Sequence, residues 1–206
     1  WRDTGAWQLT HEQRIDSRLT LLAELGQHLT SEESLAMRLA GMKDQAGVGL
    51  RYQFSRLDSV LLNYQAEEYR LQTGMRLGSG HHTNVRYTHT YRLDVPQLEF
   101  SAFGSYNAYR INPQAQAWPT LDFLPPGALD GPRTFVPRSF GFYGIEAASN
   151  MRLEQEYTRA LQPFASISGT WHTRLGAGYG VRLGVAGSVL GADHFSLTWG
   201  LGKSGP

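Results

Sequence analysis

Three histidines lie close together in the sequence and are the first candidates for chemistry. His81 and His82 are adjacent, and His89 follows them. Adjacent residues on a strand point to opposite faces, so His81 and His82 are poorly placed to bind one metal ion. The glycines, serine and asparagine of residues 78–84 are typical of a polar loop between strands. We therefore predict a loop here and no metal site.

A second candidate is the adjacent pair Asp193-His194, which resembles the acid–histidine pairs of membrane proteases. Such chemistry needs further carboxylates converging on one water molecule, and the flanking sequence shows no such pattern. The Gly-x-Ser-x-Gly nucleophile elbow is absent from the sequence, as is the His-x-Ser and Asn-Gly pattern of outer-membrane phospholipases. We expect no catalysis and no cofactor, with a barrel enzyme hydrolysing lipid or peptide as an alternative.

Cations and aromatic rings are interleaved in three stretches: Arg86-Tyr87, Tyr91-Arg92 and Tyr109-Arg110. Nucleic-acid-binding surfaces show the same pattern. Here the formal net charge is only +1, and alternation along a strand explains the pattern without a nucleic acid. We expect no nucleic-acid partner. The acidic clusters Glu67-Glu68 and Glu154 with Glu156 are predicted to form a solvated rim.

Apolar residues recur at every second position over most of the chain. Between residues 47 and 55, Val48, Leu50, Tyr52 and Phe54 alternate with small or polar side chains, which predicts a strand. Predicted strands lie near residues 6–15, 18–30, 34–42, 46–56, 58–66, 68–79, 84–95, 97–110, 138–149, 155–173, 177–190 and 193–203. Short turns join most of them, so we predict about twelve antiparallel strands with no helix between them.

Alternation alone does not say which face is buried. A soluble lipocalin-like barrel or sandwich turns its apolar face inward, whereas a membrane barrel turns it outward. Predicted strands of about 10–13 residues match the ~9–11 needed to cross a bilayer at a tilt. The 23 glycines, the 12% aromatic content and the absence of cysteine fit a barrel wall without disulfides. We predict an all-β fold, an antiparallel transmembrane β-barrel in one domain over residues 1–206, in the bacterial outer membrane.

The alternation also assigns the two faces of this barrel. Residues predicted to face lipid are Leu19, Leu21, Val48, Leu50, Tyr87, Val181, Val185, Leu197 and Trp199. Residues predicted to line the pore are Arg51, Gln53, Arg86, Arg92, Arg182 and His194. Arginines and carboxylates together in a lumen create a field that selects among solutes.

Residues 111–137 contain six prolines. Proline cannot donate to a strand ladder, so this segment is predicted to be a long loop. We predict that it acts as a plug or gate, with Trp118, Phe123, Leu124 and Phe135 as its packing side chains. The alternative is a loop outside the pore that is disordered or docks a partner.

Residues 135–144 and 178–187 contain both glycines and aromatic residues, and residues 157–164 begin at Tyr157 and end at Phe164. They resemble the C-terminal barrel of the PelB-like family of exopolysaccharide export porins, and more distantly the cellulose and poly-N-acetylglucosamine exporters. The resemblance implies passive export of a growing exopolysaccharide through the lumen, with outer-membrane lipid around the barrel and periplasmic partners feeding the chain. It also implies a sixteen-stranded barrel preceded by tetratricopeptide repeats, of which this chain would be one portion. A general diffusion porin for small solutes is the alternative within the same fold.

Overall fold

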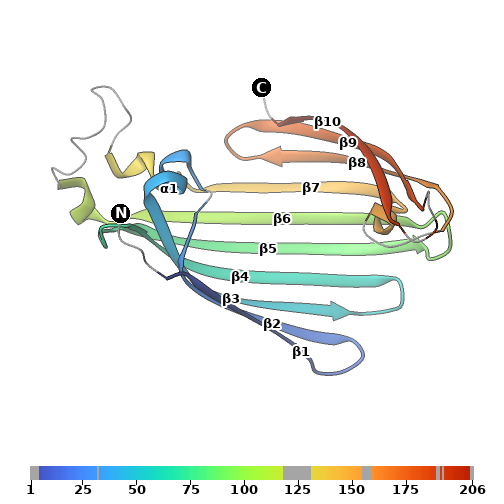
Figure 1. Ribbon diagram of the computed structural model, residues 1–206, viewed down its shortest axis with the longest axis horizontal. Coiled ribbons are helices and arrows are strands. Elements are labelled where there is room, and N and C mark those ends of the chain that lie inside the picture. Colours follow the sequence, from blue (N-terminus) through green and yellow to red (C-terminus); the bar gives the residue numbers. More distant parts are fainter. Residues whose placement is uncertain are drawn as a thin grey trace. The chain divides into compact units, whose positions relative to one another are not determined.

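The computed structural model describes residues 5–31, 33–117, 131–154, 159–188, 191 and 193–204. Ten strands follow one another in the sheet in chain order (Figure 1). They are β1 Trp7–Arg14, β2 Leu19–Leu29, β3 Gly41–Gln53, β4 Asp58–Leu71, β5 Arg76–Arg92, β6 Leu98–Ile111, β7 Phe140–Ser149, β8 Gln162–His172, β9 Gly176–Gly187 and β10 Phe195–Ser204.

The helical elements are short. They are α1 Leu35–Ala40 and the 3-10 turns η1 Pro113–Ala117, η3 Gly131–Thr134 and η4 Met151–Glu154. In the part of the chain that the structure describes, no helix is long and apolar enough to span a membrane.

The predicted antiparallel all-β sheet is confirmed, but the predicted count of twelve strands is wrong. Two differences account for the lower number. Strand β4 extends to Leu71, and β5 continues through residues 78–84, the segment predicted to be a loop. The three strands predicted at 58–66, 68–79 and 84–95 are therefore two. Residues 35–40 form α1 in place of a predicted strand. Among the described residues, the sheet order ends at β1 and at β10 without a pairing between these two strands.

Helix α1 forms because Ser34 caps its first turn. The Ser34 side chain accepts the N–H of Met37 at 3.1 Å, which satisfies a backbone donor that has no partner within the helix. Met37 is fully buried. A side chain at Gly41 would collide with Met37, so glycine ends the helix and lets β3 begin beside it.

The described residues divide into two compact units, and strands β3 to β7 contribute to both. Unit 1 comprises residues 1–51, 62–84 and 106–140, and unit 2 comprises residues 52–61, 85–105 and 141–206. The buried core of unit 1 contains Met37, Tyr69, Leu71, Met75, Leu77, Ala115, Phe135 and Val136. This core therefore joins α1, two strands and both described ends of the proline-rich segment.

In unit 1, β1 and β2 form a hairpin whose register runs from Trp7 opposite Gln27 to Arg14 opposite Thr20. The carboxylate of Asp16 closes the turn by accepting the N–H groups of Arg18 at 2.6 Å and Leu19 at 2.8 Å. These two hydrogen bonds hold the pKa of Asp16 below its ordinary value.

In unit 2, β8 pairs antiparallel with β7 and β9, and β9 pairs with β10. The ring of Phe164 lies against Gly184, where an added Cβ would come within 2.2 Å of the ring. Phe164 is only 2% exposed. The absence of a side chain at Gly184 therefore leaves room for the buried ring of Phe164.

Candidate pore-lining surface

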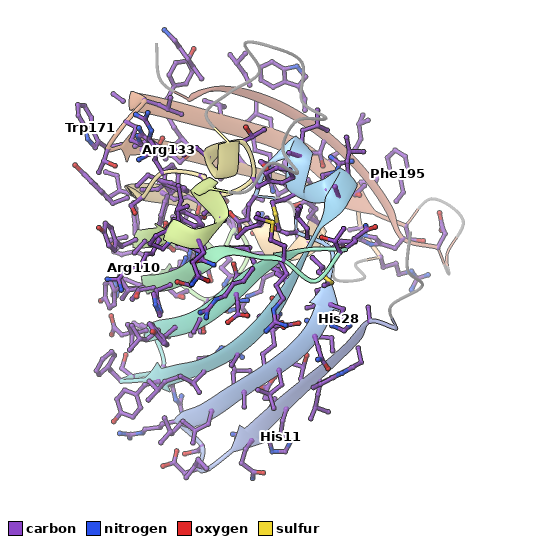
Figure 2. The ribbon with its side chains drawn as sticks, turned by 90° about the vertical axis from the view of Figure 1, so that its left-hand side faces the viewer. His11, His28, Arg110, Arg133, Trp171 and Phe195 are labelled. Atoms are coloured by element: carbon purple, nitrogen blue, oxygen red, sulfur yellow. The ribbon has the colours of Figure 1, made fainter. Side chains whose placement is uncertain are left out.

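Side chains project from both faces of the strands (Figure 2), and the two faces differ in chemistry. On the face that we call outer, large apolar side chains are exposed at alternate positions. Ile145 is 68% exposed and Ile167 is 60% exposed, whereas Glu146 and Ser168 beside them turn to the other face and are half-buried. Exposure of large apolar residues on this scale marks a surface that contacts something other than water.

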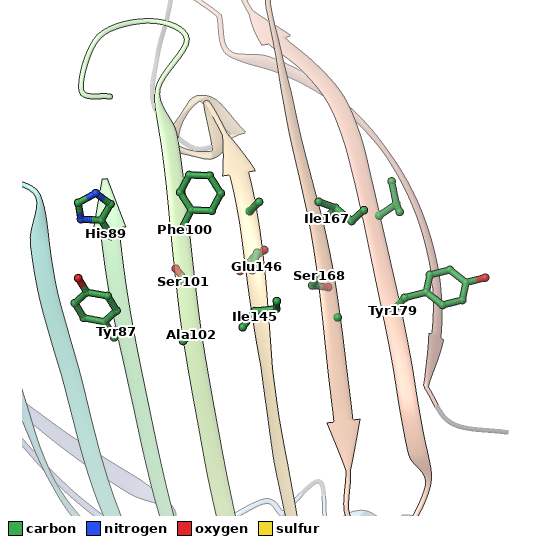
Figure 3. Close-up of a pocket in the computed structure, with 13 residues that line it drawn as sticks. Tyr87, His89, Phe100, Ser101, Ala102, Ile145, Glu146, Ile167, Ser168 and Tyr179 are labelled. Atoms are coloured by element: carbon green, nitrogen blue, oxygen red, sulfur yellow. The ribbon is translucent and has the colours of Figure 1, made fainter. Parts of the chain in front are cut away.

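Of the residues predicted to face lipid, Leu21, Val48, Tyr87, Leu197 and Trp199 are exposed large hydrophobic residues. The others are half-buried, but they share a face with exposed residues. Leu19 and Leu50 lie two positions from Leu21 and Val48, and Val181 and Val185 pair directly with Ile167 and Leu197. In unit 2, an apolar hollow of about 720 Å³ crosses β5 to β9. Figure 3 shows Tyr87, Phe100, Ile145, Ile167 and Tyr179 around it.

On the inner face, unit 1 holds a chain of polar side chains. The Gln8 and Gln45 amides both donate to Glu24. Gln65 donates to Gln45 at 2.8 Å and to Glu67 at 3.2 Å. These residues come from β1 to β4, so the hydrogen bonds cross neighbouring strands.

Glu67 is the centre of this polar chain, and its side chain is only 2% exposed. Lys43 Nζ lies 2.5 Å from Glu67 Oε1. His82 Nε2 lies 2.9 Å from Glu67 Oε2, and the Tyr69 hydroxyl donates to the same oxygen. A buried carboxylate is stable only when paired and hydrogen-bonded, and Glu67 meets both conditions.

Glu33, Glu67 and His82 offer ligand atoms that all lie within 4.8 Å of one another. A cation could be held by such a set. In this structure each group already has protein partners. Glu33 accepts from the Tyr109 hydroxyl at 2.6 Å, and His82 Nδ1 lies 2.6 Å from Asn107 Oδ1. The set therefore works as a hydrogen-bonded link between β4, β5, β6 and the segment before α1.

Three of the predicted pore-lining residues lie in ion pairs. Arg86 Nη1 lies 3.1 Å from Glu146 Oε2, and Arg182 Nη1 lies 3.2 Å from Glu154 Oε2. Arg51 lies 3.9 Å from Glu12, and both side chains are more than half exposed.

The other three predicted residues differ in position. His194 Nε2 lies 3.0 Å from the backbone oxygen of Glu154, so the structure brings His194 and Arg182 to the same residue. Arg92 donates to the Val95 carbonyl at 3.3 Å beside the β5–β6 connection. Gln53 is exposed at the end of β3. The sequence did not predict that Arg182 and His194 meet at Glu154.

Of the predicted gate residues, Phe135 is described, and Trp118, Phe123 and Leu124 lie outside the described residues. Phe135 is 1% exposed. Its carbonyl accepts a hydrogen bond from Ser34 Oγ at 2.9 Å. The proline-rich segment thus packs against α1 through at least this residue.

Sequence reasoning missed the residues around Glu67. Glu67 was predicted to lie on a solvated rim, but it is buried, because β4 extends to Leu71 and directs Gln65, Glu67 and Tyr69 to the inner face. The prediction that His81 and His82 point to opposite faces is confirmed. His81 lies 2.8 Å from the Tyr64 hydroxyl, whereas His82 contacts Glu67. The alternation of Gln65, Glu67 and Tyr69 in the sequence was the signal that could have placed these three side chains on one face of a strand.

An antiparallel sheet with an apolar outer face and a hydrogen-bonded polar inner face has the pattern expected of a strand wall in a transmembrane β-barrel. The sequence matches the family described as "PelB, C-terminal beta barrel domain" over residues 1–206. The chain belongs to this family, and its location is the bacterial outer membrane.

A comparison of structures gives an independent view of the fold. The chain is similar to a solved structure described as "Bacterial polysaccharide outer membrane secretin", with a TM-score of 0.66 and 11% sequence identity. The similarity covers 97% of this chain and 62% of that chain. At this identity the likeness establishes the fold alone. A search of curated proteins found no match.

Proposed function

We propose that the sheet is part of the wall of a closed outer-membrane barrel through which an exopolysaccharide is exported. The family membership supports a barrel, and the structural relative is described as a polysaccharide secretin. The observation that carries the proposal is the division of the sheet into an apolar outer face and a polar inner face. Lipid would cover the outer face, and water and polymer would contact the inner one.

The inner face supplies groups that suit a sugar polymer. Carboxylates, amides, hydroxyls and guanidinium groups exchange hydrogen bonds with sugar hydroxyls at little net cost, because each bond replaces one to water. Conduction requires binding that is weak enough for release. We assign this role to Arg51, Gln53, Arg86, Arg92, Arg182 and His194, and we expect periplasmic partners to deliver the polymer.

We further propose that residues 111–137 gate the lumen together with α1. Ala115, Phe135 and Val136 are almost fully buried against Met37 and the ends of β4 and β5. Both described ends of the segment therefore lie where β4 ends and β5 begins, and a gate held there would act at one mouth of the lumen.

The test uses the full-length protein in planar bilayers, with and without the polymer of the producing cell. We expect ion conductance that the polymer blocks, and loss of polymer export from cells when the barrel is deleted. Conductance that the polymer does not block, together with normal export from cells that lack the barrel, would indicate a general diffusion porin. Lipase or protease activity in detergent, abolished by substitution of inner-face residues, would contradict a purely passive channel.

A further inference from the structure

The inner face of unit 2 carries aromatic side chains that the ion pairs do not account for. Phe103 on β6 and Phe142 on β7 have ring centroids 5.7 Å apart and planes inclined by 33°. The imidazole of His172 on β8 lies 6.5 Å from the ring of Phe142, directly across the paired strands. We call Phe103, Phe142 and His172 the inner aromatic track.

The surrounding residues hold these rings in place. An added Cβ at Gly144 would lie 2.9 Å from the Phe103 ring, so glycine lets this ring approach the β7 backbone. The Arg86 guanidinium lies 4.9 Å from the Phe103 centroid, a cation–π distance. His172 Nδ1 accepts the N–H groups of Arg174 at 3.1 Å and Leu175 at 3.2 Å. The track is therefore preorganised.

The inner aromatic track also runs along the strands, from one end toward their middle. His172 is the last residue of β8, and Phe142 lies near the start of β7, at the same end of the strand pair. Phe103 lies near the middle of β6. The rings thus extend from one end of the strands toward the centre of the sheet, where Arg86 and Glu146 form their ion pair.

Packing alone does not explain the exposure of these rings. Phe164, which packs against Gly184 on the same face, is 2% exposed. Phe103, Phe142 and His172 are instead all half-buried. Each of these three residues therefore keeps part of its surface accessible.

We propose that the inner aromatic track is a stacking subsite for pyranose rings of the polymer in transit. The proposal rests on the proposed export function and names the contact that guides the sugar. One face of a pyranose presents C–H groups with partial positive charge, and the face of an aromatic ring is negative. Arg86 and Glu146 at the inner end of the track offer donors and acceptors to the hydroxyl groups at the sugar edge.

The test measures binding of cellohexaose, a neutral probe, to the full-length protein in detergent by titration calorimetry. Phe142→Leu keeps the apolar volume but removes the ring, and we expect about five- to tenfold weaker binding. Phe142→Tyr keeps the ring and should stay within about twofold of the unsubstituted protein. Tyr143→Leu, an outer-face control on the next residue, should leave binding unchanged.

Phe103→Leu provides a second variant if Phe142→Leu does not fold, as judged by heat-modifiable mobility in gels. Unchanged binding in the folded leucine variants would overturn the subsite, as would the absence of cellohexaose binding or equal binding of a polyethylene glycol of similar length. Conductance and export by the unsubstituted protein are measured separately. Failure of the proposed function would appear in those measurements, whereas failure of the subsite alone would leave them intact.

Discussion

Ser34 Oγ donates a hydrogen bond to the carbonyl oxygen of Phe135 at 2.9 Å, although 101 positions separate the two residues in sequence. The same oxygen accepts the N–H of Met37 and caps α1. One hydroxyl group therefore stabilises a helix and ties it to the end of the proline-rich segment. Met37 and Phe135 both belong to the buried core of unit 1.

The first prediction separates these two roles of Ser34. Ser34→Ala removes both hydrogen bonds and should destabilise α1 by about 1 kcal/mol. Ser34→Asp keeps a capping acceptor but cannot donate to Phe135. If the hydrogen bond from Ser34 to Phe135 holds the gate closed, both variants should increase the fraction of time that the channel is open in single-channel recordings. An aspartate variant with the open fraction of the unsubstituted protein would show that only the cap matters.

The second prediction concerns the cost of charge on each face. Ile167→Arg places a cation on the outer face in the middle of β8, opposite Val181. It should destabilise the inserted barrel by about 2–4 kcal/mol. Ser168→Arg, one residue later, turns inward opposite Glu146 and should cost much less. Reversible folding into lipid vesicles measures both, and equal costs would contradict the assigned faces.

A third prediction tests the pairing of Lys43 with Glu67. Each of Lys43→Met and Glu67→Gln should cost about 3 kcal/mol, because each leaves a largely buried partner uncompensated. The double variant should cost at least ~1 kcal/mol less than the sum. Arg51→Met is the matched control, since its pair with Glu12 is mostly exposed and should contribute about 0–1 kcal/mol. Additive costs in urea titrations would show that Lys43 and Glu67 do not interact.

Much of the fold follows from the spacing of apolar residues. Apolar side chains alternate with small or polar ones from Val48 to Phe54, and a strand is the element that gathers such a pattern on one face. The segment from Leu35 to Ala40 also alternates, and there the prediction was wrong. The Ser34 cap and the contacts of Met37 with Tyr69 and Phe135 select the helix, and these contacts are distant in sequence.

The candidate site was less accessible from sequence. Residues 78–84 have the composition of a loop, yet they continue β5, because Gly78 permits close approach of the Arg110 carbonyl. Once this strand is continuous, His82 lies beside Glu67. Arginines on the inner face could be predicted from alternation, but their acidic partners could not, since pairing depends on the register between strands.

The fourth prediction concerns pH at the β1–β2 turn. The pKa of Asp16 is lowered by hydrogen bonds from the backbone N–H groups of Arg18 and Leu19. Because this pKa is lowered, the ionised carboxylate of Asp16 stabilises the turn at pH values above its ordinary pKa of 3.8. The turn loses this stabilisation as the pH falls through the lower pKa of the folded protein.

Amide chemical shifts of Arg18 and Leu19, followed by NMR across the acid range, should report this loss. Asp16→Asn keeps a capping oxygen that does not titrate, so its shifts should stay constant. A titration midpoint of the Arg18 and Leu19 amide shifts at or above 3.8 would contradict a lowered pKa of Asp16.

The orientation of the two faces is tested most directly by spin labels at adjacent positions in β8. The sequence contains no cysteine, so single Ile167→Cys and Ser168→Cys substitutions in this chain each introduce one label site. In lipid vesicles, the Ile167→Cys label should relax with oxygen dissolved in the bilayer, and the Ser168→Cys label with a water-soluble nickel chelate. The reverse pattern, or nickel access at both positions, would contradict a barrel wall with its apolar face toward lipid.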